Sequence, residues 1–191
     1  MKHDWFFYTK KLEHSLIDDI VHHCMAETLM DGRIGAESFE DQKLNKTIRN
    51  SQISFLNKYK HKAIYDIVYD LGIEANNKAY GFDVNSLETC QFTLYDSSNK
   101  GHYDWHTDTP WVTDSMFHRK VSVVIQLSDP ADYEGGVLEI KDAKLDNEQR
   151  EAMMQKGSVI TFPSFAAHRV TPVTKGKRMS LIGWLLGAKF R

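Results

Sequence analysis

Apolar residues recur every three or four positions in two stretches of the first half of the chain, at residues 10–30 and 60–78. This spacing places them on one face of a helix, so each stretch is predicted to form an amphipathic helix. The second helix is expected to end near Gly72 or at the Asn76-Asn77 pair. The apolar positions are Leu12, Leu16, Ile17, Ile20, Val21 and Cys24 in the first stretch and Ile64, Ile67, Val68 and Leu71 in the second.

From about residue 87 the pattern changes to short apolar runs separated by turns rich in Gly, Pro and Asp. Seven or eight strands of this kind favour a double-sheet jelly roll over alternating βαβ units. We therefore expect an α+β, mainly β protein, a double-stranded β-helix (jelly roll) buttressed by N-terminal helices. The expected strands lie at 90–95, 102–108, 120–127, 136–140, 158–163, 168–173 and 178–186.

These elements predict one domain over residues 1–191, with residues 1–86 as a helical support region and residues 87–191 as the jelly-roll core. A polar loop is expected from 31 to 50, ahead of a short strand that contains Ile53, Phe55 and Leu56. The polar run at 141–156 predicts a solvated loop or a short helix.

Composition limits the classes of partner and compartment. With 191 residues, 41% of them hydrophobic, and a formal net charge of −2, the chain can bury one sizeable core. Near neutrality argues against nucleic acid or a membrane as partner, since both need a clustered basic excess. No apolar run is long enough to span a bilayer, and charges occur too early for a secretory leader. We expect a cytoplasmic protein in which Cys24 and Cys90 are buried, unpaired thiols, with its oligomeric state left open.

Two histidines and one aspartate form the most informative motif. His106-Thr107-Asp108 is followed by a lone His168, just past the apolar run at 157–163. Residues i and i+2 of a strand point to the same side, so His106 and Asp108 can bind one ion while Thr107 faces away. Two imidazoles and one carboxylate hold Fe(II) on one face and leave the opposite positions open. The motif therefore predicts an iron site.

An arginine ten residues beyond His168 adds a second chemical group. Arg178 opens a strand-like run in which Ser180, Ile182 and Trp184 share its face by the two-residue period. A guanidinium offers a planar fork of donors that matches a carboxylate, which a lysine cannot reproduce. Beside the predicted metal ligands, Arg178 is therefore a candidate carboxylate-binding residue.

Three stretches together resemble a known family: YDSSNKGHYDWHTD at 95–108, DYEGGVLEI at 132–140 and GSVITFPSFAAHRVTPVTKGKRMSLIGW at 157–184. They are similar to the Fe(II)- and 2-oxoglutarate-dependent oxygenases, specifically the prolyl 4-hydroxylase-like branch. The resemblance covers roughly residues 88–187, about half the chain. The segment between Tyr95 and His106 is slightly longer than in the family, which puts the position of Tyr95 in question. Arg178 stands where collagen-type enzymes usually have Lys and oxygen-sensing and bacterial relatives usually have Arg.

The resemblance implies a role for each matching residue. The iron ligands would be His106, Asp108 and His168. Arg178 would bind the distal carboxylate of 2-oxoglutarate, with Tyr95 as a hydroxyl donor to the same carboxylate. The neighbours lining the cosubstrate pocket would be Ser180 and Trp184.

The implied activity is oxidative decarboxylation of 2-oxoglutarate to succinate and CO2, coupled to hydroxylation of a substrate by O2, with ascorbate as reductant. A peptidyl proline in a peptide or protein is the first choice of substrate, and free proline or another small molecule is the alternative. Tyr103, Trp105 and Trp111 bracket the His-x-Asp pair and are candidates for an aromatic wall against a proline ring, although they can equally pack a loop.

Two other classes of protein have similar ligand sets. A cupin-like jelly roll can bind metal for another reaction or without chemistry, but such a site does not require a carboxylate-binding arginine. A Zn(II) hydrolase could use the same ligands with Glu134 as general base, yet Glu134 precedes Gly135-Gly136, where a turn is the simpler explanation. Formation of succinate that needs Fe(II), 2-oxoglutarate and ascorbate would separate the oxygenase from both.

Overall fold

The computed structural model describes residues 1–35 and 43–191. Part of the polar loop expected at 31–50 falls on residues 36–42 and lies outside the described residues. The helices are α1 (His14–Met25), α2 (Lys62–Ala75), which continues as a π-helical turn (Asn76–Tyr80), and α3 (Asn147–Met154), with short 3-10 turns at Ser97–Asn99 and Pro130–Asp132. The strands are β1 (Phe6–Tyr8), β2 (Met30–Asp31), β3 (Arg49–Asn50), β4 (Gln52–Phe55), β5 (Ser86–Asp96), β6 (His102–His106), β7 (Phe117–Gln126), β8 (Tyr133–Gly135), β9 (Leu138–Ile140), β10 (Val159–Pro163), β11 (His168–Val170) and β12 (Val173–Ala188).

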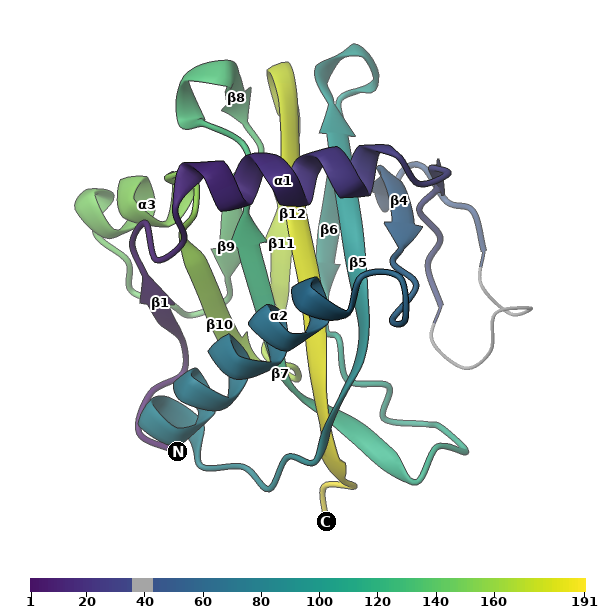
Figure 1. The fold of residues 1–191 in the computed structure, drawn as a ribbon, viewed down its shortest axis with the longest axis vertical. Helices are drawn as coiled ribbons and strands as arrows, with labels where there is room; N and C mark the ends of the chain where they lie inside the picture. The colour runs from purple at the N-terminus through teal and green to yellow at the C-terminus, as the bar shows by residue number, and fades with distance from the viewer. Residues whose placement is uncertain (36–42) are drawn as a thin grey trace.

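Two antiparallel sheets make up the β region. The larger has the strand order β1-β10-β7-β12-β5-β4-β2, with β8 pairing to β12, and the smaller has the order β3-β6-β11-β9. Helices α1 and α2 cross one face of the larger sheet, and the smaller sheet lies on its other side (Figure 1). Helices that buttress one sheet of a mainly β jelly roll are the arrangement expected from the order of elements along the chain.

The main core lies between these helices and the larger sheet, and it follows the two-residue period of the strands. Val121, Val123 and Ile125 of β7 point toward the helices and belong to one core cluster with Val68 and Leu181. The intervening residues of β7 and β12 point the other way, toward the smaller sheet. The long central strands therefore supply a hydrophobic face to the core and a second face to the space between the sheets.

Two glycines set the distance between α2 and the sheet. A Cβ on Gly72 would lie 2.5 Å from Cδ1 of Leu185, and one on Gly183 would lie 2.4 Å from Cγ1 of Val68. Helix α2 runs past Gly72, which serves close packing, and ends at Ala75 with Asn76 as its C-cap. Of the two expected ends, the one at Asn76-Asn77 is therefore confirmed and the one at Gly72 is wrong.

Other expectations from the pattern hold with adjusted boundaries. The run at 141–156 contains α3, whose N-terminus has a capping box formed by Asp146 and Gln149. Strand β12 is longer than expected, because its pairing with β5, β7 and β8 extends it from Val173 to Ala188. Both cysteines are buried and unpaired. Among residues 1–35 and 43–191, no helix is long and apolar enough to cross a membrane.

Candidate active site

A cavity of about 540 Å³ lies between the two sheets. The larger sheet contributes alternate residues of β5 and β12, and the smaller sheet contributes residues of β3, β6 and β11. The segment at 107–116, which joins β6 to β7, borders the same cavity. Of the residues singled out in the sequence, those on the cavity wall are Tyr95, Tyr103, His106, Asp108, His168, Arg178, Ser180 and Trp184.

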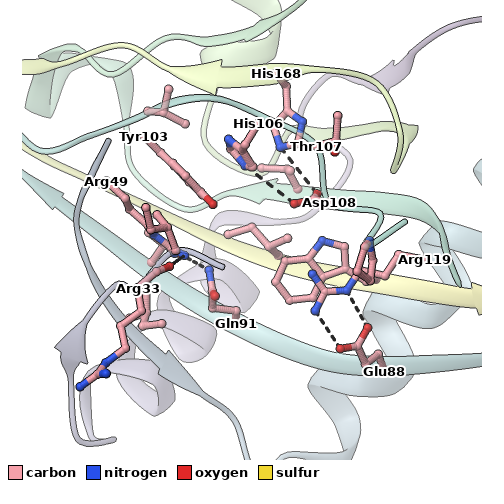
Figure 2. Close-up of a pocket in the computed structure, with 18 of the residues that line it drawn as sticks. Arg33, Arg49, Glu88, Gln91, Tyr103, His106, Thr107, Asp108, Arg119 and His168 are labelled. Carbon is pink, nitrogen blue, oxygen red and sulfur yellow. Dashed lines mark hydrogen bonds and ion pairs between the residues drawn. The ribbon is translucent and has the colours of Figure 1, made fainter. Parts of the chain in front are cut away.

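His106, Asp108 and His168 converge on one point of this cavity. The His106 Nε2 atom lies 3.7 Å from Asp108 Oδ1, and the His168 Nε2 atom lies 3.6 Å from Asp108 Oδ2. One donor atom from each residue lies within 4.8 Å of the others, a spacing that suits a single metal ion. Figure 2 shows the two imidazole rings and the carboxylate turned toward one another.

Strand pairing explains how the cluster forms. His168 of β11 pairs directly with His106 of β6, which brings together residues far apart in the chain. Asp108 follows the end of β6, and its backbone N–H donates to the carbonyl of Ser164 at 2.8 Å. Because β6 ends at His106, the two-residue alternation stops there, and Thr107 borders the cavity as well. The expectation that Thr107 faces away from a bound ion stays a prediction.

Hydrogen bonds behind the cluster orient its donor atoms. Nδ1 of His106 donates to the carbonyl of Asp104 at 2.8 Å, and Nδ1 of His168 donates to that of Ala166 at 3.0 Å. Each bond places the ring proton on Nδ1 and leaves the Nε2 lone pair for a metal. The hydroxyl of Ser122 donates to Asp108 Oδ2 at 2.7 Å. These bonds hold the three side chains in a geometry suited to coordination.

The pKa values of His106 and Asp108 agree with their metal-binding forms. Burial, together with the neighbouring His168, lowers the pKa of His106 to about 4, so its imidazole is neutral at pH 7. Burial opposes ionisation of Asp108, yet His168, His106 and Arg119 hold its pKa at about 2. Metals bind neutral imidazole and ionised carboxylate, and both forms are present near neutrality.

Arg178 lies in the same cavity and is almost fully buried, with 2% of its surface exposed. Its Nη2 donates to Oε1 of Gln126 at 3.0 Å, and Nε2 of Gln126 donates to the Tyr133 hydroxyl at 2.6 Å. Within the described parts of the chain, no ion pair involves Arg178. Gly136 makes room for it, because a Cβ at that position would lie 2.9 Å from Cδ of Arg178. The guanidinium is therefore a fixed cation facing a cavity.

Tyr95 lines the cavity despite the longer segment before His106. That segment contains a 3-10 turn at Ser97–Asn99. The guanidinium carbon of Arg178 is 5.6 Å from the centre of the Tyr95 ring. Burial raises the pKa of Tyr95, although the charges of Arg49 and Arg178 oppose this. Tyr95 is thus a neutral phenol at pH 7, able to donate a hydrogen bond toward an anion beside Arg178.

A sequence model of the 2OG-Fe(II) oxygenase superfamily matches residues 90–186, just over half of the chain, which include the metal-ligand cluster and Arg178. The chain belongs to this superfamily. Fe(II) and 2-oxoglutarate are the cofactor and cosubstrate in the superfamily's name, and the resemblance drawn from the sequence is confirmed.

Relatives and structural neighbours agree with this membership. A PKHD-type hydroxylase of Prochlorococcus marinus is 29% identical over 154 residues, which cover 76% of this chain and 67% of that protein. The next relatives align over less than two fifths of their own length. A Pseudomonas putida prolyl-4-hydroxylase superposes with a TM-score of 0.69 at 23% identity, covering 96% of this chain and 92% of that one. A Trichoplax adhaerens prolyl hydroxylase, solved with a hypoxia inducible factor peptide fragment, has a TM-score of 0.71 at 17% identity, covering 95% and 83%. These structures establish the jelly-roll fold of the oxygenase.

The three candidate aromatic residues of the oxygenase lie in different places. Tyr103 lines the cavity and stacks on His106, with ring centres 3.5 Å apart and planes inclined by 12°. Strand β6 has one extra residue between its pairings with His168 and Val170, and this bulge turns Tyr103 to the same side as His106.

The two tryptophans are outside the cavity wall. Trp105 is 43% exposed, with the guanidinium carbon of Arg169 4.9 Å from its ring centre. Trp111 is 56% exposed, and its ring centre is 5.8 Å from those of His118 and Phe190. In this structure both side chains contact neighbouring side chains of the chain itself, so contact with a substrate stays a prediction for both.

Two polar residues that support the site were not singled out from the sequence. Ser122 contacts Asp108 and Gln126 contacts Arg178. Both lie on the face of β7 opposite Val121, Val123 and Ile125, and polar residues on that alternate face were a usable signal.

Three arginines of the cavity were also missed: Arg33, Arg49 and Arg119. Arg119 forms a two-pronged ion pair with Glu88, both N···O distances being 2.7 Å, and its guanidinium carbon is 3.9 Å from the Trp184 ring centre. Arg49 comes from the segment expected to be a polar loop. No periodicity precedes Arg49, so only the fold reveals its position.

Proposed function

We propose that this protein is an Fe(II)- and 2-oxoglutarate-dependent hydroxylase in which His106, Asp108 and His168 bind the iron. The observation that supports this best is the presence, in one cavity, of the three-residue cluster and a buried arginine with no ion-pair partner within the described residues. Two imidazoles whose Nδ1 protons are donated to backbone carbonyls, together with one ionised carboxylate, suit Fe(II) and leave further coordination positions open.

Arg178 would bind the distal carboxylate of 2-oxoglutarate, with Tyr95 donating a hydrogen bond to it. Nη2 of Arg178 donates to Gln126, and its Nη1 lies 3.5 Å from the Ser180 hydroxyl. The guanidinium is therefore oriented before a ligand binds. Trp184 would close one side of the pocket. When bound, iron and 2-oxoglutarate supply an oxidant that couples formation of succinate and CO2 to hydroxylation. The chain's own part is to orient both and to keep water away from the reaction.

A proline within a peptide is the proposed substrate. The relatives are PKHD-type hydroxylases, and the structural neighbours include prolyl hydroxylases, one of them solved with a peptide fragment. Tyr103 lies beside His106 with its ring faces against His106 and Arg49, so the ring edge is the part that would contact a proline. Free proline or another small molecule is the alternative substrate, because the ring of free proline would fit the same cavity wall as the ring of a peptidyl proline.

The hydrolase alternative loses its proposed general base. Glu134 lies on β8, pairs with Lys175 at 3.1 Å, and does not line the cavity. A cupin-like protein that binds metal without oxygenase chemistry does not need a buried Arg178, for which Gly136 leaves space. The oxygenase accounts for both the metal ligands and the arginine.

The decisive experiment measures succinate and hydroxylated product from the purified protein supplied with Fe(II), 2-oxoglutarate, ascorbate and a panel of proline-containing peptides and free amino acids. We expect succinate only when both iron and 2-oxoglutarate are present. Arg178→Lys should raise the KM for 2-oxoglutarate and leave Fe(II) binding little changed, because the forked pair becomes a point charge. Absence of succinate under all conditions would overturn the proposal.

A further inference from the structure

Arg49 is a second buried arginine on the cavity wall, contributed by β3 of the smaller sheet. Only 7% of its surface is exposed. Its Nε donates to the Ser51 hydroxyl at 3.0 Å, and its Nη1 donates to the carbonyl of Arg33 at 3.2 Å. The guanidinium carbon lies 4.6 Å from the centre of the Tyr103 ring, a cation–π contact. Three different groups therefore fix this side chain.

The backbone is also shaped around Arg49. A Cβ on Gly32 would lie 2.6 Å from Nε of Arg49 and 2.5 Å from the Ser51 hydroxyl oxygen. Only a glycine at this position leaves space for the bond between Arg49 and Ser51. Figure 2 shows the Arg49 guanidinium between Tyr103 and Gln91, while the Arg33 side chain points away from the metal-ligand cluster.

The charge of Arg49 lacks a counter-charge in the described structure. Of the other arginines on the cavity wall, Arg119 is neutralised by Glu88, Arg178 is assigned to 2-oxoglutarate, and the Arg33 side chain points away from the metal-ligand cluster (Figure 2). Asp108 is assigned to the metal. Residues 1–35 and 43–191 contain no carboxylate within ion-pair distance of Arg49. Its partners among these residues are a hydroxyl, a carbonyl and an aromatic ring. A buried cation is costly unless an anion offsets it, and here the open side of the guanidinium faces a cavity that takes a substrate.

We propose that Arg49 binds a carboxylate of the substrate, so that the oxygenase selects an acidic compound or an acidic peptide. This inference rests on the proposed function and narrows its substrate class. The carboxylate could come from a free or N-acylated amino acid or from an acidic residue next to a peptidyl proline, and both sources present the same group to the guanidinium. Tyr103, stacked between Arg49 and His106, would keep the bound group and the reacting carbon at a set separation.

The test compares two pairs of probes that differ only in charge. N-acetyl-proline is compared with N-acetyl-prolinamide, and a proline peptide with Glu beside the proline is compared with the same peptide carrying Gln. The wild type should favour the charged member of at least one pair by roughly tenfold or more in kcat/KM, as expected for a hydrogen bond to a charged group. The pair that shows the preference identifies the source of the carboxylate.

Variants of Arg49 connect that preference to the residue. Arg49→Gln should abolish the preference, and Arg49→Lys should keep part of it, while the KM for 2-oxoglutarate stays unchanged in both. Lys46→Gln is the control, because it removes a cation three residues away that pairs with Asp31 on the surface. It should keep the full preference. Melting curves with each probe supply a second readout that needs no turnover, since a bound probe raises the melting temperature.

Each other outcome gives a definite conclusion. A raised KM for 2-oxoglutarate in Arg49→Gln, with the preference intact, would assign Arg49 to the cosubstrate. Equal losses on charged and neutral probes, with weaker iron binding, would make it only a support for Tyr103 and His106. The inference would be overturned if the wild type had equal kcat/KM values and equal melting shifts for both members of each pair. Absence of any succinate would instead defeat the proposed function, and the melting shifts would still decide the role of Arg49.

Discussion

Each residue of the proposed iron site is held by a partner that the metal would not contact. The carbonyls of Asp104 and Ala166 orient the two imidazoles, and the hydroxyl of Ser122 holds one oxygen of Asp108. Ser122 is itself within hydrogen-bond distance of Ser164, 2.9 Å away. Loss of such a supporting bond changes the affinity of a site without removing a ligand.

Ser122→Ala should therefore weaken Fe(II) binding by about 10- to 100-fold, the usual effect of removing a group that orients a ligand, without unfolding the protein. Metal titration of the variant and of Asp108→Ala measures this, and melting curves check the fold. Asp108→Ala should lose the metal altogether. Wild-type affinity in Ser122→Ala would show that Asp108 does not need this hydroxyl.

Gly136 gives a prediction for the cosubstrate end of the cavity. Gly136→Ala should raise the KM for 2-oxoglutarate, because the new methyl group would lie 2.9 Å from Cδ of the buried Arg178. Gly81→Ala is a matched control: both glycines have positive φ, +58° and +71°, but a Cβ on Gly81 meets open space. Both variants should lose some stability from backbone strain, and only Gly136→Ala should change the KM. If both variants had the same KM for 2-oxoglutarate, the Gly-Gly turn would have no part in cosubstrate binding.

At the scale of elements, the site depends on strands whose two faces have different tasks. The face of β12 that includes Leu181 and Leu185 packs under the helices, and the face that includes Arg178 and Trp184 lines the cavity. Helix α2 lies so close to β12 that Val68 packs directly against Gly183. Packing on the outer face of the sheet therefore fixes the position of the residues on its inner face.

Gly183→Ala should destabilise the protein by about 1–3 kcal/mol, the usual cost of overpacking a core, because the added carbon would lie 2.4 Å from Cγ1 of Val68. Val68→Ala alone should also destabilise it, by leaving a cavity. In the double variant the smaller side chain at position 68 makes room for the methyl group. The double variant should therefore lose less unfolding free energy than the two single variants lose together. Urea unfolding of the four proteins measures this coupling, and strict additivity would contradict the contact.

At the scale of the whole molecule, one core joins the N-terminal helices to the jelly roll. Cys24 of α1 and Cys90 of β5 lie in the same core cluster, together with residues of α2, β7 and β12. Burial raises the pKa of each thiol to about 12, with Glu27 adding to the effect on Cys24 and Cys24 adding to that on Cys90. The helices and the sheet should therefore open as one unit.

Both thiols should resist iodoacetamide at pH 8 in the native protein, because the reactive thiolate forms only near pH 12 and the sulfur atoms are buried. In urea both should react quickly. Mass spectrometry of samples taken across a urea titration should show the two cysteines becoming reactive together. Earlier labelling of Cys24 would show that α1 detaches before the jelly roll unfolds.

The sequence alone was enough for those features that depend on local periodicity or on short motifs. The helical stripes of α1 and α2, the strands after residue 87 and the shared face of Arg178, Ser180, Ile182 and Trp184 follow from side-chain spacing, which is a property of the backbone. His106, Asp108 and His168 were recognisable as a set because metal coordination needs these side chains whatever the fold. Their convergence in the structure agrees with that interpretation.

Tertiary structure decided the rest, because it depends on contacts between residues distant in the chain. The bulge in β6 that turns Tyr103 toward His106 arises from pairing with β11. The continuation of α2 past Gly72 depends on packing against Leu185, and local helix signals do not contain that information. Arg49 entered the cavity through pairing of β3 with β6, from a segment with no periodic pattern. Spacing specifies the elements of this protein, whereas only their assembly determines which charges face one another.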